Sequence, residues 1–171
     1  MGEKPNQDKA EQGTQTKGLE ADHPGLIAPP PIIYLISIAT GLALHYFSPM
    51  SILPNSIGVW LGGLIIVLSV SVLALCLREF QRWKTPVNPH RPTAAIIQTG
   101  PFGYSRNPVY ISLTGLQTGI AFIANSMWVL ALLVPTLMII YGGVILREER
   151  YLERKFGTEY TNYKASARRW F

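Results

Sequence analysis

The sequence has 171 residues, of which 48% are hydrophobic and only 15% are charged. About a quarter of the residues of a soluble domain are usually charged, so this composition argues against an ordinary water-exposed surface. The net charge of +5 would suit nucleic acid, anionic lipid or an acidic substrate, and the positions of the charges decide between these partners. The single cysteine, Cys76, excludes an intramolecular disulfide.

The first thirty residues are polar and rich in Lys, Glu, Gln and Gly. They lack the apolar stretch and the small-residue cleavage site of a secretory signal. We expect residues 1–30 to form a disordered tail, because they contain too little apolar surface to build a core. Residues 31–171 are then expected to form one membrane-embedded domain.

Four uncharged stretches follow the tail, at residues 31–47, 57–77, 110–124 and 127–146. A helix needs about 20 residues to cross the hydrocarbon core, and about 17 is the lower limit. The second and fourth stretches fit well and the first just fits. The third is short, but only Asn125 and Ser126 separate it from the fourth, so we expect the two to form a helical hairpin.

Pro135 should kink the fourth stretch and free a backbone carbonyl, because proline has no backbone N–H and its ring clashes with the preceding turn. The predicted fold is an all-α polytopic membrane protein, with four transmembrane helices followed by cytosolic C-terminal helices.

The fifteen basic residues lie only in the two tails and in the long loop between the second and third stretches. Three are in the N-terminal tail, five lie between Arg78 and Arg106, and seven follow from Arg147 onward. The short connections at residues 48–56 and 125–126 carry no charge. The positive-inside rule therefore predicts an inner or cytoplasmic membrane protein with both termini cytoplasmic. Since the basic residues flank apolar stretches, we expect a bilayer and no nucleic acid as partner.

The long loop, residues 84–108, ends in Arg106-Asn107-Pro108. Asn107 suits a helix N-cap and Pro108 a first helical position, so this tripeptide can be explained as a helix start alone. Arg106 adds a fixed cation where a helix N-terminus already favours anions, which would make a binding corner for a carboxylate. Both interpretations remain open.

The C-terminal segment, residues 147–171, is expected to form a charged helix that stops at Gly157 and a second helix with Thr158 as its cap. An amphipathic helix on anionic lipid would explain most of its charges. Glu148 and Glu149 fit that explanation poorly, because carboxylates at the membrane boundary gain nothing from anionic lipid. A cationic ligand, or a partner such as Arg106, would explain them.

Two segments carry a resemblance to known proteins: TGPFGYSRNPVY in the loop and REERYLERKFGTEYTNYKASARRW at the C-terminus. Together they resemble the isoprenylcysteine carboxyl methyltransferase and phospholipid methyltransferase superfamily, in particular its short prokaryotic members. The resemblance covers about residues 85–170, which is half of the chain.

The resemblance implies S-adenosyl-L-methionine bound in a cytosol-facing pocket, formed by the loop, the ends of the last two spans and the C-terminal helices, with a lateral opening for a lipophilic acceptor. The motif positions that would contact the cofactor are Ala94, Ala95, Ile96, Ile97, Phe102, Asn107, Pro108, Val109, Tyr110 and Glu148. Arg106 and Glu149 match catalytic motif positions, and Tyr160 and Tyr163 match further ones. Methyl transfer from a sulfonium needs no metal, and none is expected.

Two departures concern the acceptor. Asn107 stands where the eukaryotic prenylcysteine enzymes have His, and no basic residue precedes Glu148 by three or four positions. We therefore expect a lipophilic or small membrane-permeant acceptor, methylated on a carboxylate, amine or thiol, that is not a eukaryotic prenylcysteine. The alternative is a non-enzymatic four-helix scaffold or accessory subunit whose basic face binds lipid.

Overall fold

The computed structural model describes residues 25, 27–86 and 93–170, so the expected disorder of residues 1–30 falls almost entirely outside the described part. All regular elements in these ranges are helical. They are α2 (Pro30–Phe47), α3 (Asn55–Arg82), η2 (Gly100–Gly103), α4 (Pro108–Ile123), α5 (Met127–Ala131), α6 (Leu133–Ile140), η3 (Tyr141–Ile145), α7 (Leu146–Phe156) and α8 (Thr158–Ser166).

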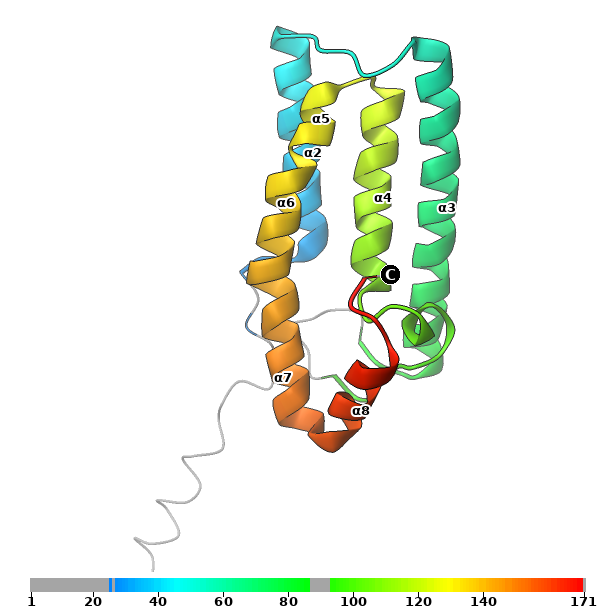
Figure 1. Cartoon of the computed structure of the whole chain (residues 1–171), viewed down its shortest axis with the longest axis vertical. Coiled ribbons are helices and arrows are strands. Elements are labelled where there is room, and N and C mark those ends of the chain that lie inside the picture. The colour runs from blue at the N-terminus through cyan, green and yellow to red at the C-terminus, as the bar shows by residue number, and fades with distance from the viewer. Residues whose placement is uncertain (1–24, 26, 87–92, 171) are drawn as a thin grey trace, which may run out of the picture.

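The helices form an antiparallel bundle in which α2, α3, α4 and the long arm α5–α6–α7 alternate in direction, and α8 folds back beneath the bundle (Figure 1). Three helices are long and apolar enough to cross a membrane: Pro30–Phe47, Ser56–Arg82 and Met127–Phe156. The multi-pass prediction is confirmed to this extent. With 16 residues, α4 is shorter, so the count of four spans stays a prediction.

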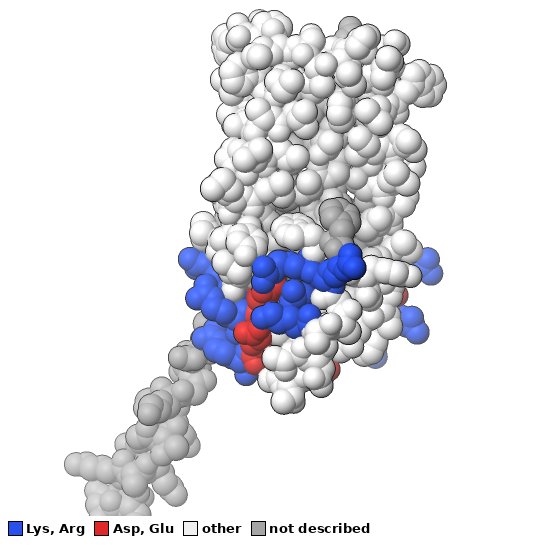
Figure 2. Space-filling model, in the orientation of Figure 1, with Lys and Arg blue, Asp and Glu red and all other residues white. Residues whose placement is uncertain are grey.

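The charged side chains gather at one end of the bundle, while the rest of the visible surface is uncharged (Figure 2). Large apolar side chains point outward along α2 and α3, among them Leu35, Trp60, Leu64 and Val67. Soluble monomers rarely expose a continuous apolar patch larger than a few hundred Å². This surface therefore suits hydrocarbon.

A seam of glycines brings α3 and α4 into close contact. A Cβ on Gly62 would lie 2.5 Å from the carbonyl oxygen of Gly119, and one on Gly119 would lie 2.9 Å from the oxygen of Gly62. Gly58 and Gly115 extend the contact at the same four-residue spacing. Small residues at this spacing let helix backbones approach within a bilayer, where the hydrophobic effect does not hold helices together.

Polar side chains inside the bundle join α2, α4 and the arm. Nε2 of Gln117 on α4 donates to Oγ of Ser37 on α2 (2.9 Å) and to the carbonyl of Val129 on α5 (3.1 Å). Thr136 on α6 also bonds Ser37 (2.8 Å). Side chains such as these fix the relative rotation of helices that are otherwise uniformly apolar.

The hairpin predicted at Asn125 and Ser126 is present. Asn125 has a positive φ of 47°, and its Oδ1 accepts the backbone N–H groups of Ile52 (2.7 Å) and Leu53 (3.1 Å). Oγ of Ser126 accepts the N–H of Val129 and caps α5. Asn125 therefore makes the turn and also holds the connection between α2 and α3, while Ser126 caps α5.

The arm is interrupted twice. The first interruption is at Leu132, between α5 and α6, three residues before Pro135, where the missing proline N–H was expected to disturb the helix. The second is a π-helical turn at Tyr141–Ile145, which contains two adjacent glycines and which the sequence analysis did not predict. A π turn inserts one extra residue into an α-helix and often lies at a functional site.

The glycine seam predicts opposite effects at two neighbouring positions. Gly62→Ala should destabilise the bundle by about 1–3 kcal/mol, because its methyl group would collide with the backbone of α4. The matched control is Gly63→Ala: its Cβ meets nothing within 4 Å, so it should be neutral or slightly stabilising. Thermal unfolding of both variants in detergent checks this. Equal midpoints would contradict the seam.

Candidate functional site

A cavity of about 150 Å³ lies at the charged end of the bundle, between residues 93–106, α7 and α8. Its apolar lining is Phe80, Pro86, Ala95, Ile96, Ile97, Phe102 and Leu152. Its polar lining is Thr85, Thr93, Arg106, Glu148, Tyr151, Tyr160 and Tyr163. Such a mixture suits a ligand with a flat apolar part and charged ends.

Arg106 directly precedes α4 and is held where the loop meets the C-terminal segment. Its side chain is only 9% exposed, and its Nη1 lies 3.5 Å from Oε1 of Glu149. Within the described part of the chain, its Nε and Nη1 have no hydrogen-bond partner. Buried guanidinium donors without partners are costly, so this side chain is suited to an anion in the cavity.

Glu148 lies on the first turn of α7 and faces the same cavity. Its Oε2 accepts a hydrogen bond from the hydroxyl of Tyr110 on α4 (2.8 Å). The pKa of Glu148 is raised to about 7, mainly by burial; the Tyr110 hydrogen bond lowers it and the neighbouring Glu149 carboxylate raises it. Near neutral pH this carboxyl is therefore easily protonated or deprotonated.

Glu149, one residue further on, is buried and points to a different set of partners. Its Oε1 accepts a hydrogen bond from Nε of Arg169, and its Oε2 accepts one from Nη2, both at 2.9 Å. This two-point pairing raises the pKa of Arg169 above its ordinary value. With Arg106 beside it, Glu149 is a buried carboxylate between two guanidinium groups.

Helix α8 closes the cavity from below with two tyrosines. The hydroxyl of Tyr163 donates to the carbonyl of Phe102 (2.7 Å), which ties α8 to η2. Burial is the main reason why the pKa of Tyr160 is raised to about 12, and it raises the pKa of Tyr163 as well, so both hydroxyls stay neutral. The expected stop at Gly157 is confirmed, with φ at 54°. The expected cap at Thr158 is wrong, because Gly157 occupies the N-cap position and Thr158 is already helical.

The last described residues return to the start of α4. The N–H of Arg106 donates to the carbonyl of Arg168 (2.8 Å), and Nδ2 of Asn107 donates to the carbonyl of Arg169 (2.9 Å). Asn107 does occupy the N-cap position of α4, but its side chain makes no capping bond. Asn107 is therefore the N-cap by position, while its amide holds the C-terminal segment. Pro108 begins the helix as expected.

A groove runs beside the cavity in two connected parts. The interfacial groove, about 1410 Å³, lies between the end of α3, η2 and the C-terminal segment, and Arg78, Arg82 and Arg168 border it. The membrane groove, about 730 Å³, continues between α3, α4 and α6 and has an almost wholly apolar lining. Val72, Ile111 and Trp170 line both parts, which makes them one path from the apolar spans to the charged end.

The model of the phospholipid methyltransferase family matches residues 57–159, which is more than half of the chain. The chain belongs to the phospholipid methyltransferase family. No curated protein and no solved structure matches it. The resemblance found in the sequence is thereby confirmed, and the match extends it to most of α3. Membership of the phospholipid methyltransferase family implies a membrane methyltransferase.

The structure brings part of the predicted site of this methyltransferase together. Of the residues predicted to contact the cofactor, Ala95, Ile96, Ile97, Phe102 and Glu148 line the cavity, with Arg106 beside them. Tyr110 reaches it through Glu148. The others lie elsewhere: Ala94 is exposed, Asn107 bonds the C-terminal segment, Pro108 borders the interfacial groove, and Val109 packs against the cluster around Cys76.

Sequence reasoning missed Arg169, although it holds Glu149 with two bonds. The only available signal was the stop at Gly157, which reverses the chain and brings the C-terminus back toward α4. Arg169 also donates to the hydroxyl of Tyr141 (3.1 Å) in the π turn. A basic group therefore lies beside the helix before Glu148 after all, so the missing basic residue in the sequence does not by itself exclude a carboxylate acceptor.

Glu148 should make stability depend on pH. Its folded pKa of about 7 lies above the ordinary value of 4.5, so ionising it destabilises the folded state as pH rises from about 4.5 to 7. Above pH 7 the full penalty, on the order of 3 kcal/mol, applies. Glu148→Gln should therefore raise the unfolding midpoint at pH 8 and have much less effect at pH 5. The exposed Glu159→Gln is the control, and an unchanged midpoint for Glu148→Gln at pH 8 would contradict the assignment.

Proposed function

We propose that the protein is an integral-membrane methyltransferase that uses S-adenosyl-L-methionine and methylates a lipophilic acceptor. One observation carries this proposal: Arg106, with free guanidinium donors, and Glu148, with a carboxyl group, face the same small cavity among apolar side chains. The family membership supports methyl transfer, and these residues support the choice of cofactor.

The residues of the cavity fit the groups of this cofactor. Its carboxylate suits the free Nε and Nη1 of Arg106, and its ammonium or ribose hydroxyls suit Glu148. Its adenine suits the apolar side chains of Ile96, Ile97 and Phe102. The described cavity is smaller than the roughly 300–1,000 Å³ typical of such ligands. Pro86 and Thr93, which flank a gap in the described part of the chain, both line it.

When bound, the cofactor supplies a methyl group that its sulfonium makes electrophilic. The protein's task is to orient this group and exclude water. In this proposal Arg106 and Glu148 hold the two polar ends, and α8 covers the apolar part. Tyr110 orients the Glu148 carboxylate by its hydrogen bond. Neither a metal nor a covalent nucleophile takes part.

The acceptor would reach the site along the groove. The membrane groove is apolar and lies between helices at the depth of the spans, so a chain of methylenes fits it. The interfacial groove has basic side chains at its border, where the polar part of an acceptor would lie. The methylated group itself, whether carboxylate, amine or thiol, is left open by these contacts.

The alternative, a scaffold without activity, shares the fold and the basic end of the molecule. It gives no reason for two buried guanidinium nitrogens of Arg106 that lack hydrogen bonds beside the Glu148 carboxyl group. Binding of the cofactor separates the two functions, because a scaffold would not bind it.

We first predict the effect of two substitutions on cofactor affinity. Arg106→Ala and Glu148→Ala should each weaken binding of S-adenosyl-L-methionine by about 1.5–3 kcal/mol, the scale of charge-assisted hydrogen bonds. Calorimetry of the full chain in detergent gives the dissociation constants. Arg147→Ala is the matched control. Arg147 lies on α7 next to Glu148, but its side chain is exposed and donates to the carbonyl of Gly25. Unchanged affinity in both test variants would remove these residues from the site.

A second prediction concerns the groove. In liposomes, each added methylene of a homologous acceptor series should increase effective affinity by about 0.8 kcal/mol until the groove is filled. Val72→Trp, where the two parts of the groove meet, should lower turnover of long acceptors without changing cofactor affinity. Leu64→Trp on the outward side of α3 is the control. Equal turnover of short soluble and long-chain acceptors would refute lateral entry.

The four-span topology is also part of the proposal, with both termini and the site on the cytoplasmic side. Cysteine introduced at the exposed Ser51 should react with an impermeant maleimide outside intact cells, and cysteine at Ser166 should not. Cys76 is fully buried and should give little background. Labelling at Ser166 from outside would overturn the orientation.

A further inference from the structure

We infer that Arg169, near the C-terminal end of the chain, is a positioning residue. By binding the Glu149 carboxylate, it keeps the hydrogen-bond donors of Arg106 available to a ligand in the cavity. The inference rests on the proposed function, because it concerns the anionic end of the cofactor.

The Glu149 carboxylate lies between two arginines that hold it unequally. Arg169 satisfies both oxygens, with two hydrogen bonds of 2.9 Å in the fork geometry that guanidinium and carboxylate share. Arg106 approaches only to 3.5 Å, close enough for an ion pair but without a hydrogen bond from Nη1. The two arginines and Glu149 carry a net charge of +1, which remains for an anion while the neighbouring Glu148 is protonated.

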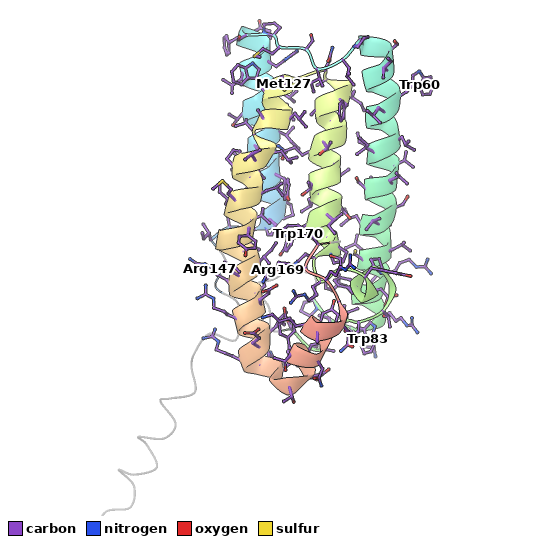
Figure 3. The ribbon with its side chains drawn as sticks, viewed as in Figure 1. Trp60, Trp83, Met127, Arg147, Arg169 and Trp170 are labelled. Carbon is purple, nitrogen blue, oxygen red and sulfur yellow. The ribbon has the colours of Figure 1, made fainter. Side chains whose placement is uncertain are left out.

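The backbone fixes which arginine takes the carboxylate. Residues 167–170 lie along residues 105–107 in a parallel bridge, with the N–H of Arg106 donating to the carbonyl of Arg168. Asn107 and Ser105 both donate to the carbonyl of Arg169. Figure 3 shows Arg169 and Trp170 between α4 and the arm. This docking directs the Arg169 side chain toward α7, where Glu149 is.

Without Arg169, the nearest cation to Glu149 would be Arg106. A buried carboxylate stripped of its partner is strongly unfavourable, so Glu149 would draw the Arg106 guanidinium into full hydrogen bonds. The Arg106 donors that now lack hydrogen bonds would then be used by Glu149. Arg169 therefore acts on the cavity through Glu149, and its loss is expected to weaken anion binding although Arg169 itself does not line the cavity.

A simple structural role predicts something different. If Arg169 only fastened the C-terminal segment, removing Glu149 as well would leave that segment no better held. If Arg169 acts by binding the Glu149 carboxylate, then neutralising Glu149 in the Arg169 variant should make the Arg106 donors available to the ligand again. The two roles differ in the sign of the coupling between the two substitutions.

The experiment compares affinities for S-adenosyl-L-methionine and S-adenosylhomocysteine, by calorimetry in detergent, in five full-length proteins: wild type, Arg169→Ala, Glu149→Gln, the double variant, and Arg147→Ala as the charge-matched control. Arg169→Ala should weaken binding at least tenfold, and the double variant should recover to within about threefold of Glu149→Gln. Arg147→Ala should bind as wild type. If Arg169→Ala does not fold, Arg169→Lys replaces it: a lysine keeps the charge without the fork, and an intermediate loss is expected.

Two results would overturn the inference. They are wild-type affinity in the Arg169 variant, and a double variant as weak as Arg169→Ala alone. If the wild-type protein binds neither compound, the proposed function itself fails, and the inference fails with it. Binding by the wild type without the expected pattern among the variants removes only the role of Arg169.

Discussion

A single carboxylate, that of Glu149, joins the parts of the chain that make the site. It lies on α7, accepts both hydrogen bonds of Arg169 from the C-terminal segment and pairs with Arg106 at the start of α4. A buried carboxylate is tolerated only when it is paired and hydrogen-bonded, so the three segments are held in one arrangement. Removing Glu149 would leave the two arginines without their shared carboxylate.

This arrangement separates two environments that a membrane methyltransferase has to bring together. The cavity beneath α4 has charged and hydroxyl groups, while the groove beside it is apolar and continues between the spans. Trp170 lines both parts of the groove and packs against the cluster that includes Tyr110, whose hydroxyl bonds Glu148. The C-terminal segment is therefore both a wall of the groove and a support of the cavity.

Much of this arrangement could be predicted from the sequence because it follows from local chemistry. Runs of uncharged residues predicted the helices, Pro135 the break in the arm, and Gly157 the stop before α8. The nearness of Arg106 to the glutamates at 148 and 149 also follows from charges at neighbouring helix ends. These features need only the composition of a segment and its distance from the membrane boundary.

Features that depend on how distant segments meet could not be predicted. The small residues at Gly58, Gly62, Gly115 and Gly119 are visible in the sequence, but nothing there says that α3 and α4 are the pair they join. The side chain of Asn107 left its helix for the carbonyl of Arg169, an option that exists only once the chain end has returned. Arg169 itself looks like one more basic residue in a charged tail.

The π turn at Tyr141–Ile145 sets the helical phase of the site. Each residue of an α-helix advances the side chains by about 100°, so a helix lacking that one extra residue would present all of α7 rotated by about that angle. Glu148 would then turn out of the cavity and Glu149 away from both arginines. The alignment of the carboxylates with their partners is thus a matter of register, decided by one residue in a turn that precedes them both.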